Sequence, residues 1–91
     1  MKVIKIGAMW CPACIKMGKF WNNVKNNFSS TQFEELDLDM DEDEVKKYNI
    51  GDTLPVIIVF DETKEIKRII GEKKEEELFK ELGDVLENDN N

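Results

Sequence analysis

The sequence contains no histidine, and its only two cysteines are Cys11 and Cys14. A structural zinc site normally uses four protein ligands, so the chain lacks the donors for one of its own, and we expect no metal. No apolar run is long enough for a membrane-spanning helix, which needs about 20 residues. The sequence begins at once with a strand pattern instead of the longer apolar segment of a secretory signal. We therefore expect a cytoplasmic protein.

Basic residues are also few. The chain has 13 basic and 20 acidic residues, which gives a net charge of −7. This balance repels nucleic acid and anionic lipid, so we expect neither a nucleic-acid nor a membrane partner. An acidic stretch at residues 34–44 and a Glu-rich segment near the C-terminus read as solvated faces, with docking of a basic partner as the alternative for the first. The 91 residues show no repeat or linker, which predicts a single domain over residues 1–91, acting as a monomer.

Hydrophobic periodicity predicts the order strand, helix, strand, helix, strand, strand, helix. The expected strands are residues 3–6, 33–39, 55–60 and 65–70, and the expected helices are residues 12–28, 39–48 and 75–86. Apolar residues at spacings of three and four give the first helix one buried face: Cys14, Met17, Trp21, Val24 and Phe28. Residues 87–91 form a polar tail that we expect to fray. The fold class is therefore α/β.

The two cysteines are separated by Pro12 and Ala13 and directly follow the first expected strand. Cys11 would lie at a helix N-terminus, where free backbone N–H groups and the helix dipole stabilise a thiolate. Pro12 suits the first helical turn, because its missing N–H costs little there. Cys14, one turn later, is close enough to form a disulfide with Cys11. We interpret the pair as a redox dithiol; two inert thiols, or a metal shared between chains, are the alternatives.

Together with this order of elements, the segment Trp10-Cys11-Pro12-Ala13-Cys14 resembles the active-site motif of the thioredoxin superfamily in its minimal form. Leu54-Pro55 is similar to the cis-proline element of that family. Phe60 and Gly71 fall where thioredoxins keep an apolar strand end and a glycine beside the active site. The resemblance covers nearly the whole chain and implies a four-stranded mixed central sheet flanked by three helices.

The resemblance also implies how substrate binds. A cis Pro55 would pack against the dithiol and leave the backbone of Leu54 free to pair with an extended substrate segment, near Gly71. The alternative is a trans Pro55 that simply begins an edge strand. Trp10 would be an exposed apolar platform, extended by Met9 and Ala8, or else a large residue half buried against a loop.

Two positions depart from the thioredoxin pattern. Lys5 lies in the first strand where thioredoxins carry a buried carboxylate behind the second cysteine, and Glu35 lies where they carry a lysine. The two charges are thus exchanged relative to thioredoxins. If Lys5 is buried, we expect the pair to determine the local electrostatic field at Cys14. A solvent-facing Lys5 with no role in the chemistry is the alternative.

Glutaredoxins resemble the chain less closely. Thr53-Leu54-Pro55 is similar to their Thr-Val-Pro, but Ala13 replaces their usual aromatic residue, and Gly71-Glu72 replaces their glycine pair. The resemblance therefore implies a thiol-disulfide oxidoreductase that reduces protein disulfides without a cofactor, with Cys11 as nucleophile and Cys14 as the buried resolving thiol. A flavin-dependent thioredoxin reductase, or else glutathione, would restore the dithiol. A glutathione-dependent glutaredoxin-like enzyme and a non-catalytic thioredoxin-like binding module are the alternative functions.

Overall fold

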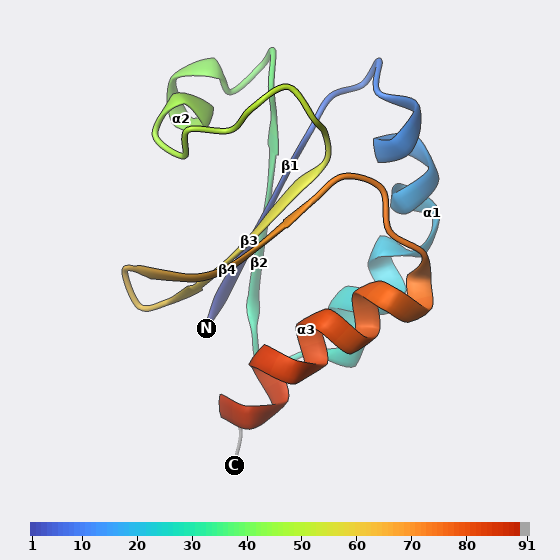
Figure 1. The fold of residues 1–91 in the computed structure, drawn as a ribbon, viewed down its shortest axis with the longest axis vertical. Coiled ribbons are helices and arrows are strands. Elements are labelled where there is room, and N and C mark those ends of the chain that lie inside the picture. Colours follow the sequence, from blue (N-terminus) through green and yellow to red (C-terminus); the bar gives the residue numbers. More distant parts are fainter. Residues whose placement is uncertain (90–91) are drawn as a thin grey trace.

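The computed structural model describes residues 1–89, and its element order is the predicted βαβαββα (Figure 1). The four strands are β1 (Lys2–Gly7), β2 (Gln32–Asp37), β3 (Val56–Asp61) and β4 (Lys64–Ile70). The three helices are α1 (Pro12–Asn27), α2 (Glu42–Lys46) and α3 (Glu75–Asp89). The strands and helices form an α/β fold, as expected.

The strands form one mixed sheet in the order β2-β1-β3-β4. β1 runs parallel to β2 and antiparallel to β3, and β3 runs antiparallel to β4. Ile6 pairs with Val56, and Val56 pairs with Ile70. The end of β1, the beginning of β3 and the end of β4 therefore meet at one edge of the sheet.

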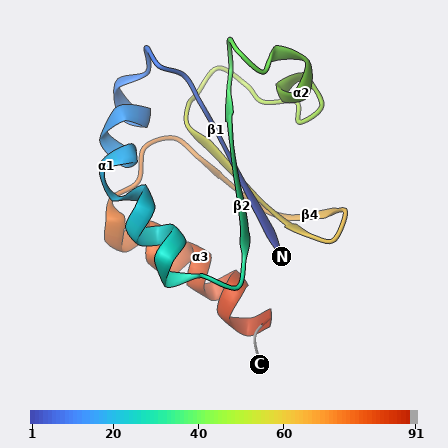
Figure 2. The same ribbon diagram turned by 180° about the vertical axis from the view of Figure 1, so that it is seen from behind.

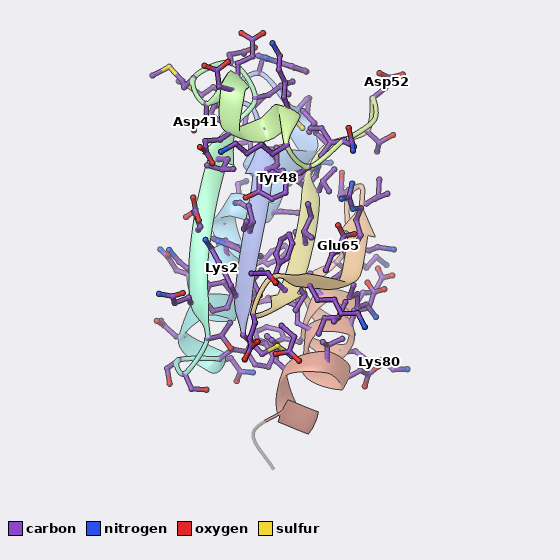
Figure 3. The ribbon with its side chains drawn as sticks, turned by 90° about the vertical axis from the view of Figure 1, so that its left-hand side faces the viewer. Lys2, Asp41, Tyr48, Asp52, Glu65 and Lys80 are labelled. Atoms are coloured by element: carbon purple, nitrogen blue, oxygen red, sulfur yellow. The ribbon has the colours of Figure 1, made fainter. Side chains whose placement is uncertain are left out.

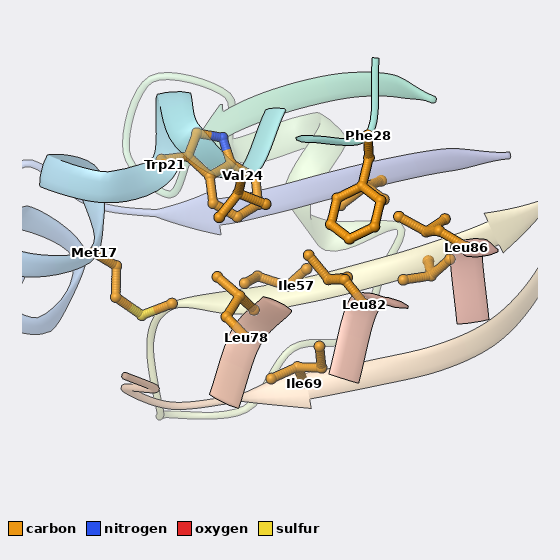
Figure 4. Packing of buried hydrophobic residues seen from close by; sticks show 11 residues of the cluster. Met17, Trp21, Val24, Phe28, Ile57, Ile69, Leu78, Leu82 and Leu86 are labelled. Carbon is orange, nitrogen blue, oxygen red and sulfur yellow. The ribbon is translucent and has the colours of Figure 1, made fainter. Parts of the chain in front are cut away.

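Helices cover both faces of the sheet unequally. α1 and α3 lie together on one face, and the short α2 lies on the other, over one end of the strands (Figures 1 and 2). Between the sheet and the two long helices lies the larger core cluster, shown in Figure 4. To this cluster α1 contributes Met17, Trp21 and Val24 and its C-cap residue Phe28, and α3 contributes Leu78, Leu82 and Leu86. The predicted apolar face of α1 is therefore buried, apart from the partly exposed Cys14.

Side chains of β1 alternate between the two faces, as strand geometry requires. Val3 belongs to the cluster beneath α1 and α3. Ile4 and Ile6 belong to a second cluster on the α2 face, against which Tyr48 packs (Figure 3). This alternation places Lys5 and Gly7 on the same face as Val3, beneath α1.

Strand β2 ends two residues earlier than predicted. The expected strand ran to about residue 39, but the chain turns after Asp37, whose Oδ1 accepts hydrogen bonds from the N–H groups of Asp39 and Met40 at 2.9 and 3.0 Å. The carboxylate of Asp41 in turn accepts a bond from the Asp37 N–H at 2.8 Å. These local bonds compete with the strand ladder and delay α2 until Glu42.

The last helix is longer than predicted, because α3 continues to Asp89 instead of ending near Leu86. The helix thus includes residues 87–89 of the polar tail, and the expectation that this tail frays stays a prediction. The rest of that tail, residues 90–91, lies outside the described residues.

Candidate active site

Cys11 is the N-cap residue of α1, directly after the turn that follows β1. Its backbone N–H donates to the Ala8 carbonyl at 3.1 Å, and Pro12 takes the first helical turn. Its Sγ accepts a hydrogen bond from the Cys14 backbone N–H at 3.2 Å. A sulfur in the N-cap position faces unpaired backbone N–H groups and the positive end of the helix dipole.

Cys14 lies one turn along α1, with its sulfur against the end of β1. A Cβ atom placed on Gly7 would lie 3.1 Å from Cys14 Sγ. Any residue other than glycine at position 7 would therefore force the Cys14 sulfur or the strand to shift. The pKa of the Cys14 thiol is raised to about 11, chiefly because burial disfavours the thiolate and because its S–H donates to Cys11. The positive charge of Lys5 acts in the opposite direction.

The burial of the two cysteines is the reverse of the sequence-based expectation. Cys11 is only 5% exposed, whereas Cys14 is partly exposed. The reason is geometric, because Cys14 borders an open cavity between β1, β2 and the start of α1. Both residues are free thiols.

This cavity has a volume of about 290 Å³. Its lining combines the second cysteine with one cation, three carboxylates and apolar groups: Lys5, Gly7, Ala8, Met9, Cys14, Ile15, Glu35, Leu36, Asp37 and Asp41. The cavity brings charged groups of β2 and of the turn after it to the side of Cys14. Asp37 and Asp41 were not among the site residues predicted from the sequence. They reach the cavity because the chain turns at the end of β2.

Lys5 is buried and paired with Glu35, which confirms the predicted pairing. The two residues are register partners on β1 and β2, and Lys5 Nζ lies 3.4 Å from Glu35 Oε1. The Lys5 side chain is 10% exposed and that of Glu35 49%. The ammonium also lies 4.7 Å from the ring centroid of Trp21, which is a cation–π contact. The sequence does not predict this contact, because it depends on how α1 packs on β1.

Trp10 is exposed, as the platform interpretation requires. It is 61% exposed, next to Met9 at 80%, but Ala8 is buried, so the expectation that Ala8 extends the exposed apolar area is wrong. The Ala8 carbonyl accepts the Cys11 N–H, and Ala8 lines the same cavity as Cys14. The Trp10 Nε1–H donates to Asp39 Oδ2 at 2.7 Å, which ties the dithiol turn to the turn after β2.

The Leu54–Pro55 peptide bond is cis, as the family resemblance implied. The Pro55 carbonyl accepts a hydrogen bond at 2.9 Å from the N–H of Gly71, which has a φ of 91°. Leu54 is partly buried against the α2-face cluster. Because Pro55 immediately precedes β3 and Gly71 immediately follows β4, both lie at the edge of the sheet where β1 leads into the dithiol turn.

Residues 1–89 contain no cluster of three or more histidine, cysteine or acidic residues placed to hold a metal ion. Over the same residues, none of the helices combines the length and apolar character needed to cross a bilayer.

A mixed sheet with a Cys-x-x-Cys pair at a helix N-terminus and a cis-proline at the same edge defines a redox-dithiol α/β protein. The thioredoxin family model matches residues 1–84, and the chain belongs to the thioredoxin family. It is 32% identical to thioredoxin H2 of Arabidopsis thaliana over 74 residues, or 81% of this chain and 55% of that protein. It is 33% identical to a thioredoxin of Mycoplasma genitalium over 69 residues, or 76% of this chain and 67% of that protein.

Solved structures agree with this assignment of the fold. Thioredoxin 1 from Thermosipho africanus superposes with a TM-score of 0.83 at 23% identity, over 100% of both chains. Thioredoxin from Trypanosoma brucei brucei superposes equally well, with a TM-score of 0.83 at 23% identity over 94% of this chain and 74% of that one. The chain spans 55–67% of the length of the curated relatives that it matches.

Proposed function

We propose that the protein is a thiol-disulfide oxidoreductase that reduces disulfides of other proteins, with Cys11 as nucleophile and Cys14 as resolving thiol. The observation that carries this proposal is the position of Cys11 Sγ at the N-cap of α1, where it accepts the Cys14 N–H at 3.2 Å. Membership of the thioredoxin family supports the same activity.

The reaction proceeds in two exchanges. The Cys11 thiolate attacks one sulfur of the substrate disulfide, the substrate S–S bond breaks, and the second substrate sulfur leaves as a thiolate that takes a proton from solvent. Cys14 then loses its proton and attacks Cys11 Sγ, which releases the first substrate sulfur with its electron pair. Two electrons pass to the substrate, and the protein keeps a Cys11–Cys14 disulfide. The dithiol itself carries the electrons, so the reaction needs no cofactor.

Electrostatics, not exposure, support this division of roles. The raised pKa of Cys14 keeps that residue a thiol near neutral pH, and the same S–H donates to Cys11 and stabilises its thiolate. Pro12 and Ala13 space the two sulfurs by one helical turn. Because Cys11 is 5% exposed, a substrate disulfide must approach it closely at the helix terminus.

The surface around the dithiol suits an extended protein segment. Trp10 offers an exposed apolar surface on one side, and the backbone of Leu54 before Pro55 offers hydrogen-bonding groups next to Gly71. We assign substrate binding to these four residues. A flavin-dependent thioredoxin reductase is the proposed electron donor, glutathione is the alternative donor, and a reducing cytoplasm is the compartment in which such a dithiol stays functional.

Single cysteine variants test the proposal. We expect the wild-type protein to reduce a model protein disulfide, Cys11→Ser to lose this activity, and Cys14→Ser to accumulate a mixed disulfide through Cys11. Alkylation of the reduced protein with iodoacetamide, followed by peptide mass mapping, should modify Cys11 before Cys14. Preferential labelling of Cys14 would reverse the roles, and a wild-type protein without reductase activity would favour a thioredoxin-like binding module.

The choice of electron donor is tested separately. Oxidised protein is mixed with NADPH and a flavin-dependent thioredoxin reductase, or with reduced glutathione, NADPH and glutathione reductase. We expect faster turnover in the first mixture, because Glu72 and the acidic start of α3 offer little attraction to anionic glutathione. Faster turnover with glutathione would identify a glutaredoxin-like enzyme instead.

A further inference from the structure

The buried cation beside the dithiol has no part in the exchange steps described above. Lys5 and Gly7 are two residues apart on β1, so their side-chain positions lie on the same face of the sheet. Gly7 lies directly against Cys14 Sγ, and Lys5 borders the same cavity as that sulfur. The Cα atoms of residues two apart on a strand are roughly 7 Å apart, so Lys5 and the residue against Cys14 are neighbours on this face. The positive charge of Lys5 acts on the Cys14 sulfur, with which it shares the cavity.

Two contacts hold the Lys5 ammonium in this place. Glu35 lies 3.4 Å away on the neighbouring strand, and the ring centroid of Trp21 lies 4.7 Å away on α1. Glu35 also reaches the more exposed Lys25 at 3.5 Å, so its carboxylate is shared between two cations. Lys5 is therefore fixed behind Cys14 while its own counterion is half exposed to solvent and shared.

We infer that Lys5 is a positioning residue for the second exchange step, in which its fixed positive charge stabilises the Cys14 thiolate as that thiolate attacks Cys11. The Cys14 proton leaves to water in the open cavity, the Cys14 sulfur bonds to Cys11 Sγ, and the substrate sulfur departs with the electron pair of the broken bond.

The other charged groups around Cys14 do not supply this effect. From β2, Glu35 and Asp37 border the cavity, and Asp41 borders it from the start of α2. Cys11 faces Cys14 from the same helix, but in this step its sulfur is bonded to the substrate sulfur and carries no charge. Among the cavity-lining groups in the described part of the chain, Lys5 is the only cation. The Cys14 thiolate is therefore favoured by a backbone hydrogen bond at Ala8 and, among the side chains that line the cavity, by Lys5.

The inference rests on the proposed function, in which Cys14 attacks Cys11 during reduction of a substrate. Its first test, however, needs no substrate. The Cys14 thiolate is titrated by its absorbance at 240 nm in a Cys11→Ser background, with Lys5, Lys5→Met or Lys5→Arg. We expect Lys5→Met to raise the Cys14 pKa by about one unit, a roughly tenfold smaller thiolate fraction, and Lys5→Arg to leave it within about 0.3 units. An unchanged pKa in Lys5→Met would overturn the inference.

The second test separates a fixed charge from a proton acceptor. Mixed disulfides are formed on Cys11 in proteins that retain Cys14, and their resolution is followed in single turnovers at neutral pH. We expect Lys5→Met to resolve about tenfold more slowly and Lys5→Arg, which keeps the charge but cannot accept a proton, to match the wild type. Equal slowing in both variants, or in neither, would contradict a role for the charge.

Two controls keep the comparison specific. Lys25→Met removes the other cation bound to Glu35 without changing the cavity lining, and we expect it to leave the Cys14 pKa and the resolution rate unchanged. Circular dichroism verifies that each variant is folded; if Lys5→Met is not, Lys5→Gln replaces it in the same comparison. A protein that shows the Lys5-dependent titration but no reductase activity would refute the proposed function and leave the electrostatic coupling intact.

Discussion

Gly7 and Cys14 lie against each other at the end of β1 and the first turn of α1, and a side chain on Gly7 would crowd the Cys14 sulfur. A Cβ atom at position 7 would stand 3.1 Å from Cys14 Sγ and 3.4 Å from Cys14 Cβ. The contact fixes the side of the helix from which the sulfur reaches the cavity. It also makes the glycine a position where a single methyl group changes the dithiol.

Gly7→Ala is expected to lower the free energy of unfolding by about 1–3 kcal/mol, because the methyl group must displace Cys14 or shift the strand. The matched control is Gly18→Ala in α1, where a Cβ meets nothing within 4 Å and alanine favours the helix, so that stability rises by roughly 0.5–1 kcal/mol. Urea unfolding of both variants measures the difference. Equal stability of Gly7→Ala and the wild type would refute the close contact.

The raised pKa of Cys14 makes stability depend on alkaline pH. Between the ordinary thiol pKa of 9.0 and the folded value of about 11, the unfolded chain loses this proton while the folded protein keeps it. The folded state then binds more protons than the unfolded state, so this contribution to stability is complete below pH 9.0 and is lost as pH rises toward 11.

Comparison with Cys14→Ser isolates this effect from the lysines and the tyrosine that also titrate at high pH. Under reducing conditions, the unfolding free energy of the wild type should fall relative to that of Cys14→Ser between pH 9.0 and about pH 11. A difference that stays constant over this range would mean that folding does not raise the Cys14 pKa.

The Lys5–Glu35 pair is expected to stabilise the fold moderately. Removing the partner of a fully buried charge costs about 3–5 kcal/mol, but Glu35 is 49% exposed and the cavity admits water, so we expect Glu35→Gln to cost about 1–2 kcal/mol. Glu34→Gln is the control on the opposite face of β2, because its ion pair with Lys2 is 2.8 Å long but exposed at both ends. Urea unfolding should show less than about 1 kcal/mol for the control. Equal losses would place Lys5 effectively in solvent.

Much of this architecture could be predicted from the sequence, because periodicity and turn residues act locally. Apolar patterns and an acidic first turn indicated each strand and helix, though not the end of β2, and the spacing of Cys11 and Cys14 indicated the redox pair. The pairing of Lys5 with Glu35 followed from the family resemblance, which aligned two strands that periodicity alone does not align.

What could not be predicted depends on how distant segments meet. The turn at Asp37 ends β2 through side-chain bonds that strand propensity does not include, and that turn brings Asp39 to Trp10 and Asp41 to the cavity. The greater exposure of Cys14 follows from this cavity, which no local pattern describes. Burial of the Lys5 ammonium against Trp21 likewise required the packing of α1 on β1.

Trp10 provides the remaining test of the proposed substrate surface. An exposed indole beside a reactive sulfur contributes binding to a large partner but little to a small reagent, because only the large partner covers it. Trp10→Ala should therefore lower kcat/KM for a protein disulfide at least fivefold, which corresponds to about 1 kcal/mol, and change the rate with a small aromatic disulfide less than twofold. Ile66→Ala is the matched control, since Ile66 is an exposed apolar residue of β4 near the end of the sheet away from the dithiol. Parallel losses with both substrates would show that Trp10 shapes the dithiol turn itself, through its 2.7 Å bond to Asp39, and does not serve as a platform for substrate.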